Sequence, residues 1–70
     1  MSRDITSFFG KDVLIVTTDN KIFIGYVTSY ETKVDSPDGI ANIDVDGTEQ
    51  IPYGSINFSD TEIKSIKEIE

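Results

Sequence analysis

The 70-residue sequence contains no cysteine and no histidine, and its longest apolar run is the four residues from Val13 to Val16. The absence of cysteine excludes disulfide bonds, thiolate nucleophiles and cysteine-ligated zinc, and the absence of histidine removes the usual neutral-pH base and a common metal ligand. A membrane span needs roughly 20 apolar residues, and no hydrophobic leader follows Met1. We therefore expect a cytoplasmic protein with no membrane partner.

Basic residues are scarce, with 6 against 13 acidic residues and a formal net charge of −7. Nucleic-acid binding depends largely on neutralising phosphates, so this balance disfavours RNA and argues against DNA as a partner. No nucleophile with a base partner and no glycine-rich phosphate cradle is present. The acidic turns at 35 to 39 and 44 to 47 lack the spacing of a calcium loop. The sequence therefore predicts a protein that is not an enzyme, with no catalytic residues, cofactor or metal site.

Leucine is also rare, since 1 Leu stands against 11 Ile, 5 Val and 7 Thr. β-Branched residues fit a pleated surface better than a helix, so the composition predicts a mostly β protein. The length allows one domain, residues 1 to 70, with a small core. The residues expected in that core are Phe8, Val13, Ile15, Ile24, Val27, Ile43, Val45, Ile56, Ile63 and Ile66.

The first half of the chain predicts a short helix followed by a hairpin. Ile5, Phe8 and Phe9 recur at helical spacing, which predicts a short N-terminal α-helix. Two β-branched stretches, 12 to 18 and 22 to 30, are separated by a polar turn. This pattern is typical of two antiparallel strands joined in a hairpin.

The second of these strands has apolar residues on both faces. One face carries Ile22, Ile24, Tyr26, Thr28 and Tyr30, and the other carries Phe23, Gly25, Val27 and Ser29. A sheet curled on itself would bury part of both faces. Gly25 in mid-strand suits a sharp bend or the close approach of another backbone, which a small barrel requires.

The second half predicts a loop and three further strands. The loop covers 31 to 39, and alternating stretches over 40 to 46 and 51 to 58 predict two strands. Residues 63 to 69 fit either a fifth strand after a 3₁₀ turn at 60 to 62 or a short closing helix, and their isoleucines favour the strand. We therefore expect a five-stranded, strongly bent antiparallel barrel with a short N-terminal α-helix.

Several features between Ile5 and Glu31 match one known family. They are the N-terminal helix, the Gly10-Lys11 step, the polar turn Asp19-Asn20-Lys21, the central Gly25 of the second strand and the Tyr30-Glu31 end of that strand. In this order they resemble the Sm-like (LSm) small β-barrel family. The resemblance implies a homo-oligomer whose open edge strands pair between copies, so we expect a protein partner or self-association through edge strands.

RNA-binding members of that family carry an Asp-x-x-Met-Asn loop after the second strand and an Arg-Gly step between the last two strands. The residues that stand at these places, which we term the candidate rim, are Tyr30, Glu31, Val34, Asp35, Ser59 and Asp60. Asp35 in place of Asn loses a hydrogen-bond donor, and Ser59-Asp60 replaces a cation with a hydroxyl and an anion. RNA binding is therefore expected to be weak. The sequence favours a non-catalytic binding or assembly module, and the alternative is an RNA-binding Sm-like oligomer with an atypical site.

Overall fold

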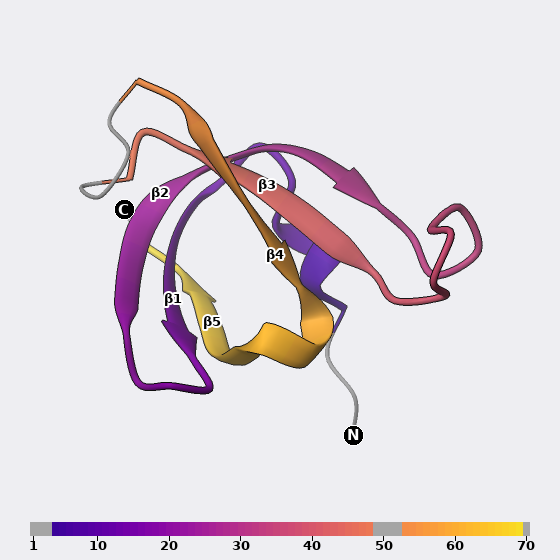
Figure 1. The fold of residues 1–70 in the computed structure, drawn as a ribbon. Helices are drawn as coiled ribbons and strands as arrows, with labels where there is room; N and C mark the ends of the chain where they lie inside the picture. The colour runs from indigo at the N-terminus through magenta and orange to yellow at the C-terminus, as the bar shows by residue number, and fades with distance from the viewer. Residues whose placement is uncertain (1–3, 49–52, 70) are drawn as a thin grey trace.

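The structure is a computed structural model that describes residues 4–48 and 53–69. Its elements are the 3₁₀ helix η1 (Ile5–Phe8), the strands β1 (Asp12–Thr17), β2 (Ile22–Glu31), β3 (Asn42–Asp46) and β4 (Ser55–Ser59), the 3₁₀ helix η2 (Asp60–Glu62) and the strand β5 (Ile63–Glu68). The five strands form one antiparallel sheet in the order β4-β3-β2-β1-β5 (Figure 1). The prediction of a mostly β chain with five antiparallel strands is confirmed, and the C-terminal stretch is a strand.

The sheet curves strongly because its two outermost strands are neighbours in the sequence. In a flat sheet, four inter-strand spacings of about 4.8 Å would separate β4 from β5 by roughly 19 Å. The connecting η2 has only 3 residues, which rise about 6 Å in a 3₁₀ helix. The sheet therefore curls until the end of β4 meets the start of β5 (Figure 1).

The sheet is nevertheless not closed into a barrel, so that part of the prediction is wrong for the single chain. In the part of the chain that the structure describes, β4 pairs only with β3 and β5 pairs only with β1. Each outermost strand therefore keeps an open edge. β4 begins at Ser55, later than the predicted start at residue 51, and residues 51 and 52 lie outside the described residues.

The N-terminal helix is a single 3₁₀ turn rather than the predicted α-helix. Asp4 caps the turn, because its carboxylate accepts hydrogen bonds from the Thr6 backbone N at 3.0 Å and the Thr6 hydroxyl at 2.6 Å. Gly10, with φ of 78°, then turns the chain into β1. The 4 residues of η1 that fit between these two points are too few to sustain an α-helix. None of the described helices is long and apolar enough to cross a membrane.

The core lies on the concave side of the sheet and is covered at one end by η1. Its buried members are Ile5, Val13, Ile15, Val27, Ala41, Ile43, Val45, Phe58 and Ile63, with Phe8, Phe23, Ile56 and Ile66 half-buried against them. The predicted core is therefore largely confirmed. Ile24 is the exception, because it is 49% exposed and lies in register with Leu14 on the outer face. Ile5, Ala41 and Phe58 belong to the core although the prediction omits them.

The end of β3 approaches β2 closely at Gly25. A Cβ atom at this position would lie 2.6 Å from the backbone oxygen of Asp46 and 2.7 Å from Cγ1 of Val45. Real Cβ contacts are longer than this, so only glycine fits without displacing β3. The close backbone approach that the sequence suggested for Gly25 is present in the structure.

Candidate functional site

Three residues of the candidate rim meet at one end of the sheet. Glu31 ends β2 and Ser59 ends β4, and both are in register with Asn42, the first residue of β3. Asn42 Nδ2 donates a hydrogen bond to Glu31 Oε1 at 3.0 Å. Asp60 follows Ser59, and its backbone N donates to the carbonyl of Ala41 at 2.9 Å. The fold therefore brings the loop after β2 and the turn before β5 together, as a two-part rim requires.

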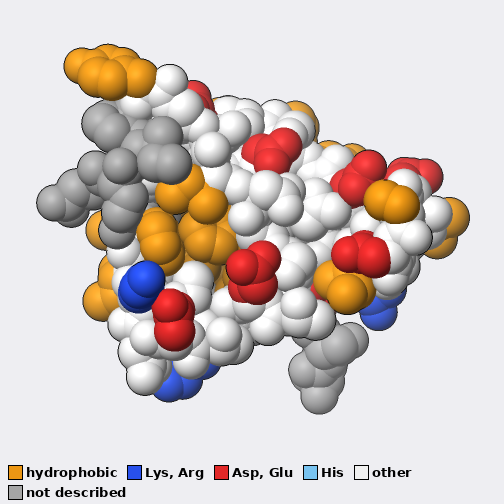
Figure 2. All heavy atoms as spheres, viewed as in Figure 1, with side chains coloured by type: hydrophobic (Ala, Val, Ile, Leu, Met, Phe, Trp, Pro, Cys, Tyr) orange, Lys and Arg blue, Asp and Glu red, His pale blue; other side chains and the backbone are white. Residues whose placement is uncertain are grey.

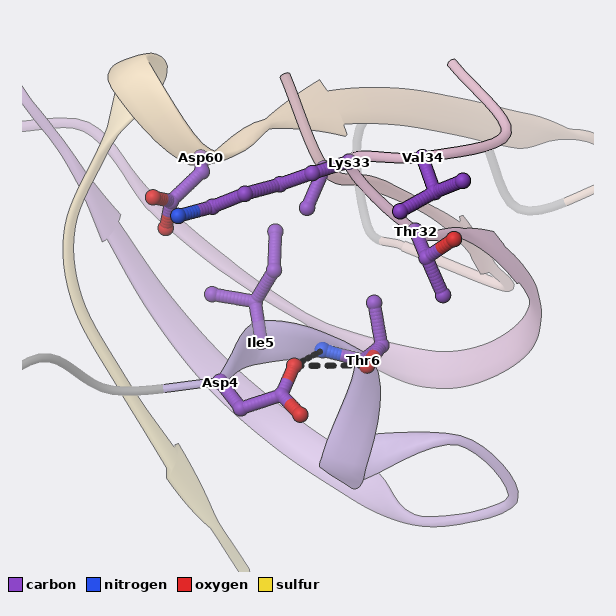
Figure 3. A pocket seen from close by; sticks show the side chains of 8 residues that line it. Asp4, Ile5, Thr6, Thr32, Lys33, Val34 and Asp60 are labelled. Carbon is purple, nitrogen blue, oxygen red and sulfur yellow. Dashed lines mark hydrogen bonds between the residues drawn. The ribbon is translucent and has the colours of Figure 1, made fainter. Parts of the chain in front are cut away.

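A cavity of about 340 Å³ opens between η1, this loop and η2 (Figure 3). We call it the rim cavity, and its lining residues are Asp4, Ile5, Thr6, Thr32, Lys33, Val34, Ala41 and Asp60. The side chain of Lys33 extends toward Asp60, while the carboxylate of Asp4 turns to Thr6 (Figure 3). The rim cavity thus combines an apolar part with one amine and two carboxylates.

Two charged residues of the rim cavity were not among the predicted site residues. Lys33 is the only base between Glu31 and Glu49. Its isolation within an acidic segment could have identified it as a candidate site residue. Asp4 stands two residues before Thr6, a spacing at which a carboxylate commonly caps a backbone amide. Neither signal reveals that η1 and the loop face each other across a cavity, which requires the three-dimensional fold.

Tyr30 lies on the opposite face from the one that its position in the sequence predicts. The register of β2 against β3 shifts around Thr28, and this bulge reverses the alternation of the strand. Tyr30 is thereby in register with the buried Ile43. Its ring packs edge-to-face on Phe9 with centroids 5.2 Å apart, and it remains 48% exposed. Tyr30 does not line the rim cavity.

Ser59 holds the turn between β4 and β5. Its hydroxyl and its backbone N each donate to Glu62 Oε1 at 3.0 Å, which forms a capping box. The box stabilises the short connection between the two edge strands, and this connection is what curls the sheet. The hydroxyl of Ser59 therefore supports the turn and is already engaged within the chain.

The loop between β2 and β3 is ordered by its own short side chains. Thr32 Oγ1 donates to Asp35 Oδ2 at 3.1 Å, and the backbone N of Ser36 donates to the carbonyl of Thr32 at 2.9 Å. Val34 projects outward at this turn and is 92% exposed. Asp35 is therefore tied to the loop, whereas Val34 is presented to the solvent where it lines the rim cavity.

The pKa of Asp38 is lowered below its ordinary value of 3.8 by hydrogen bonds from the Ser36 hydroxyl at 2.5 Å and the Ile40 backbone N at 3.1 Å. Because the folded pKa is depressed, the stabilisation is fully present above the unfolded value and is lost as the pH falls through the folded pKa. We expect an NMR titration of Asp38 to have its midpoint below 3.8, and Ser36→Ala to raise that midpoint.

Asp19 provides the control for this titration, because its pKa is also lowered, chiefly by a hydrogen bond from the Thr17 hydroxyl. Ser36→Ala should leave the depressed midpoint of Asp19 in place. A midpoint of Asp38 that does not respond to Ser36→Ala would contradict the assigned hydrogen bond.

Negative charge dominates the surroundings of the rim cavity. Among the described residues, the acidic side chains there are Asp4, Glu31, Asp35, Asp38 and Asp60, and Lys33 is the base. Figure 2 shows several acidic side chains spread over the right of this face, where the loop between β2 and β3 lies in Figure 1. No group of three or more His, Cys, Asp or Glu residues is placed to hold a metal ion within residues 4–48 and 53–69. The field around the cavity opposes the approach of a phosphate.

A second cavity, of about 410 Å³, lies along the open edge of β4, and we call it the seam cavity. Its lining residues are Thr17, Thr18, Asp19, Lys21, Phe23, Ile56, Asn57, Phe58 and Glu62. Phe23 and Phe58 pack edge-to-face with centroids 5.1 Å apart. Figure 2 shows apolar side chains exposed on the left of this face, between β4 and the β1–β2 pair of Figure 1. The open seam of the sheet therefore exposes part of its apolar interior.

The two candidate sites in the described part of the chain are thus an acidic rim cavity at one end of the sheet and an apolar seam between two open edges. No family model, no curated protein and no solved structure matches the chain.

Proposed function

We propose that the protein is a non-catalytic, Sm-like assembly module that self-associates by pairing the open edge of β4 in one copy with the open edge of β5 in the next. The observation that carries the proposal is the strand order β4-β3-β2-β1-β5, in which each outermost strand has one partner. An open edge presents backbone N–H and C=O groups that another strand can satisfy. Since two different edges meet, the contact is head-to-tail and closes into a ring when the rotation per copy allows it.

The chemistry of the two edges supports this pairing. The residues of β4, Ser55–Ser59, include no charge and no proline, which are common devices that keep natural edges apart. The outer side of the neighbouring β3 carries Asp44 and Asp46, and β5 carries Lys64 and Lys67. Docking β5 of one copy on β4 of another brings these lysines toward those carboxylates, which favours this orientation.

The seam cavity supports the same contact. Phe23 and Ile56 line it and are only half-buried in the single chain. A second copy that pairs with β4 would cover this surface and remove apolar area from water, at roughly 25 cal/mol per Å². The edge contact therefore combines backbone hydrogen bonds with apolar burial.

Sedimentation velocity tests the proposal on the unmodified protein. We expect a species larger than a dimer of the 7.8 kDa chain, and we expect it to tighten as salt rises, because copies with a net charge of −7 repel each other less when screened. A 7.8 kDa monomer at both low and high salt would contradict the proposal.

A matched pair of variants at Ile56 identifies the edge. Ile56→Lys places an inward-pointing charge on β4, a device that prevents edge pairing, and should abolish the larger species. Ile56→Met keeps a neutral side chain of similar length, so this variant should still form the larger species. Circular dichroism of both variants establishes that the sheet has formed. Equal association of the two variants would place the contact elsewhere.

The alternative function is that of an RNA-binding oligomer with an atypical site, and the observation in its favour is the Lys33 amine in the rim cavity. The acidic rim opposes this function, so we expect a Kd for oligo-U weaker than about 1 μM at physiological salt. Asp35→Asn combined with Asp60→Arg should tighten binding and introduce a salt dependence. Binding by the unmodified protein tighter than about 1 μM would favour the RNA-binding alternative over the assembly module.

A further inference from the structure

The outer face of β1 and β2 carries an unusually apolar surface, which we call the outer patch. Its members are Leu14, Val16, Ile22, Ile24 and Tyr26, paired across the two strands as Leu14 with Ile24 and Val16 with Ile22. Ile22, Ile24 and Tyr26 are 57%, 49% and 46% exposed. The solvent face of an antiparallel sheet is ordinarily polar, and a continuous apolar patch on it commonly marks an interaction site.

The outer patch is distinct from the two features described above. It faces away from Gly25 and Val27, which point to the concave side of the same strand. Its strands β1 and β2 lie inside the sheet order, so it contains neither open edge. In Figure 1 the β1–β2 pair lies on the left and the loop of the rim cavity lies on the right. A ligand on the outer patch would therefore leave both the edges and the rim cavity accessible.

Charges of opposite sign border the outer patch at two of its corners. Asp12 and Asp46 are each in register with Tyr26 and form an acidic corner. On the other side, Lys67 is in register with Leu14, and Lys64 reaches Asn20 in the β1–β2 turn with Nζ 2.8 Å from its Oδ1. These two lysines form a basic corner on β5.

Two further charge pairs near the outer patch are formed within the described part of the chain. Lys11 Nζ lies 3.4 Å from Glu68 Oε1, and Lys21 Nζ lies 3.6 Å from Asp19 Oδ2. The patch therefore has an apolar centre, a corner with two negative charges and a corner with two positive charges. This arrangement is complementary to itself.

We infer that the outer patch binds the outer patch of a second copy of this chain through a two-fold contact. A two-fold axis in the plane of the contact lays the acidic corner of each copy over the basic corner of the other and the apolar centres over each other. Between chains with a net charge of −7, such corner pairing replaces repulsion with attraction at the contact. The apolar centre lies on the interior strands β1 and β2, so substitutions there test this inference separately from the proposed edge pairing. The basic corner lies on β5, which edge pairing also uses.

Neutral substitutions test the apolar centre by equilibrium sedimentation of the full chain. Ile24→Gln should weaken the two-fold contact by about tenfold or more, because it places a polar amide at the centre of the patch. Val34→Gln is the matched control, since Val34 is 92% exposed but lies in the loop outside the outer patch, and it should leave association unchanged. Amide NMR spectra of both variants establish that they are folded.

Charge reversal in the Ile56→Lys background, where edge pairing is blocked, tests the predicted orientation of the outer-patch contact. Asp12→Lys and Lys67→Asp should each weaken the contact, because each places like charges at both meeting corners. The double variant retains the original net charge and should recover most of the lost affinity, since its corners are again opposite.

The outcomes separate this inference from the proposed function. In Ile56→Lys, where edge pairing is blocked, a dimer that Ile24→Gln dissociates would support the outer-patch contact. If Ile24→Gln associates as the unmodified protein does, or if the double charge variant shows no recovery, the inference is overturned, whatever the edges do. A larger species lost in Ile56→Lys but unaffected by Ile24→Gln would leave only the edge pairing.

Discussion

Gly25→Ala is expected to lower the free energy of unfolding by about 3 kcal/mol, at the upper end of the range for overpacking a well-packed site. The added Cβ would lie 2.6 Å from the backbone oxygen of Asp46, 2.7 Å from Val45 Cγ1 and 3.1 Å from Thr48 Cγ2. A backbone oxygen held in the β2–β3 ladder cannot rotate away as a side chain can. The end of β3 would have to move, so we expect a large shift in the urea denaturation midpoint.

Gly39→Ala is the control for this experiment. It adds the same methyl group where no other atom lies within 4 Å, and its cost comes from a φ of 72°, which is about 1 to 2 kcal/mol for a side-chain-bearing residue. The additional loss of unfolding free energy in Gly25→Ala, compared with Gly39→Ala, therefore measures the contact with β3. A Gly25→Ala protein as stable as the unmodified one would contradict the close approach of the two strands.

Ile43→Ala is expected to lower the free energy of unfolding by about 2 to 5 kcal/mol. Ile43 is fully buried in β3, between β2 and β4, so its truncation leaves a cavity that both neighbours help to enclose. Ile66→Ala should cost less, because Ile66 is half-buried on the open strand β5. Chemical denaturation of the variants gives the comparison.

Ile24→Ala supplies the surface reference for the same series. Ile24 is 49% exposed, and its truncation in the single chain should cost less than about 1 kcal/mol. Equal losses at Ile24 and Ile43 would mean that the two faces of the sheet are not divided as the structure places them.

Strands were predictable from this sequence because their signal is local. Alternating apolar and polar residues in segments such as 42 to 46 mark a strand with one buried side, and the register of that strand with β4 follows the alternation without interruption. The bulge around Thr28 has no comparable signal, since Thr28 fits the alternation as well as its neighbours do. For that reason the sequence assigned Tyr30 to the wrong face, and the error does not extend to Val27, which precedes the bulge.

The N-terminal helix and the barrel were predicted less well, for different reasons. The spacing of Ile5, Phe8 and Phe9 suits an α-helix and a 3₁₀ turn alike, and the choice depends on how few residues separate the Asp4 cap from Gly10. Closure of the sheet depends on pairing between β4 and β5, which are joined by η2 but lie at opposite ends of the strand order. Local sequence patterns do not encode that pairing.

The candidate rim was predictable in part, because the strand order alone places the end of β2 near the end of β4. That is why Glu31 and Ser59 flank Asn42. The rim cavity itself is completed by Asp4 and Lys33, which come from separate segments that meet only in the folded chain. Its chemistry could therefore not be derived from the two motif positions.

Concentration-dependent amide hydrogen exchange of β4 and β5 tests the central claim, edge-to-edge assembly, most directly. Pairing between copies would slow exchange at amides that point away from β3 in β4 and away from β1 in β5, and this protection should grow with protein concentration. The amides of the interior strand β2 serve as the internal reference, because both of its neighbours are present in the single chain. We expect protection at both edges together; edge amides that exchange equally fast at every concentration would contradict edge-to-edge assembly.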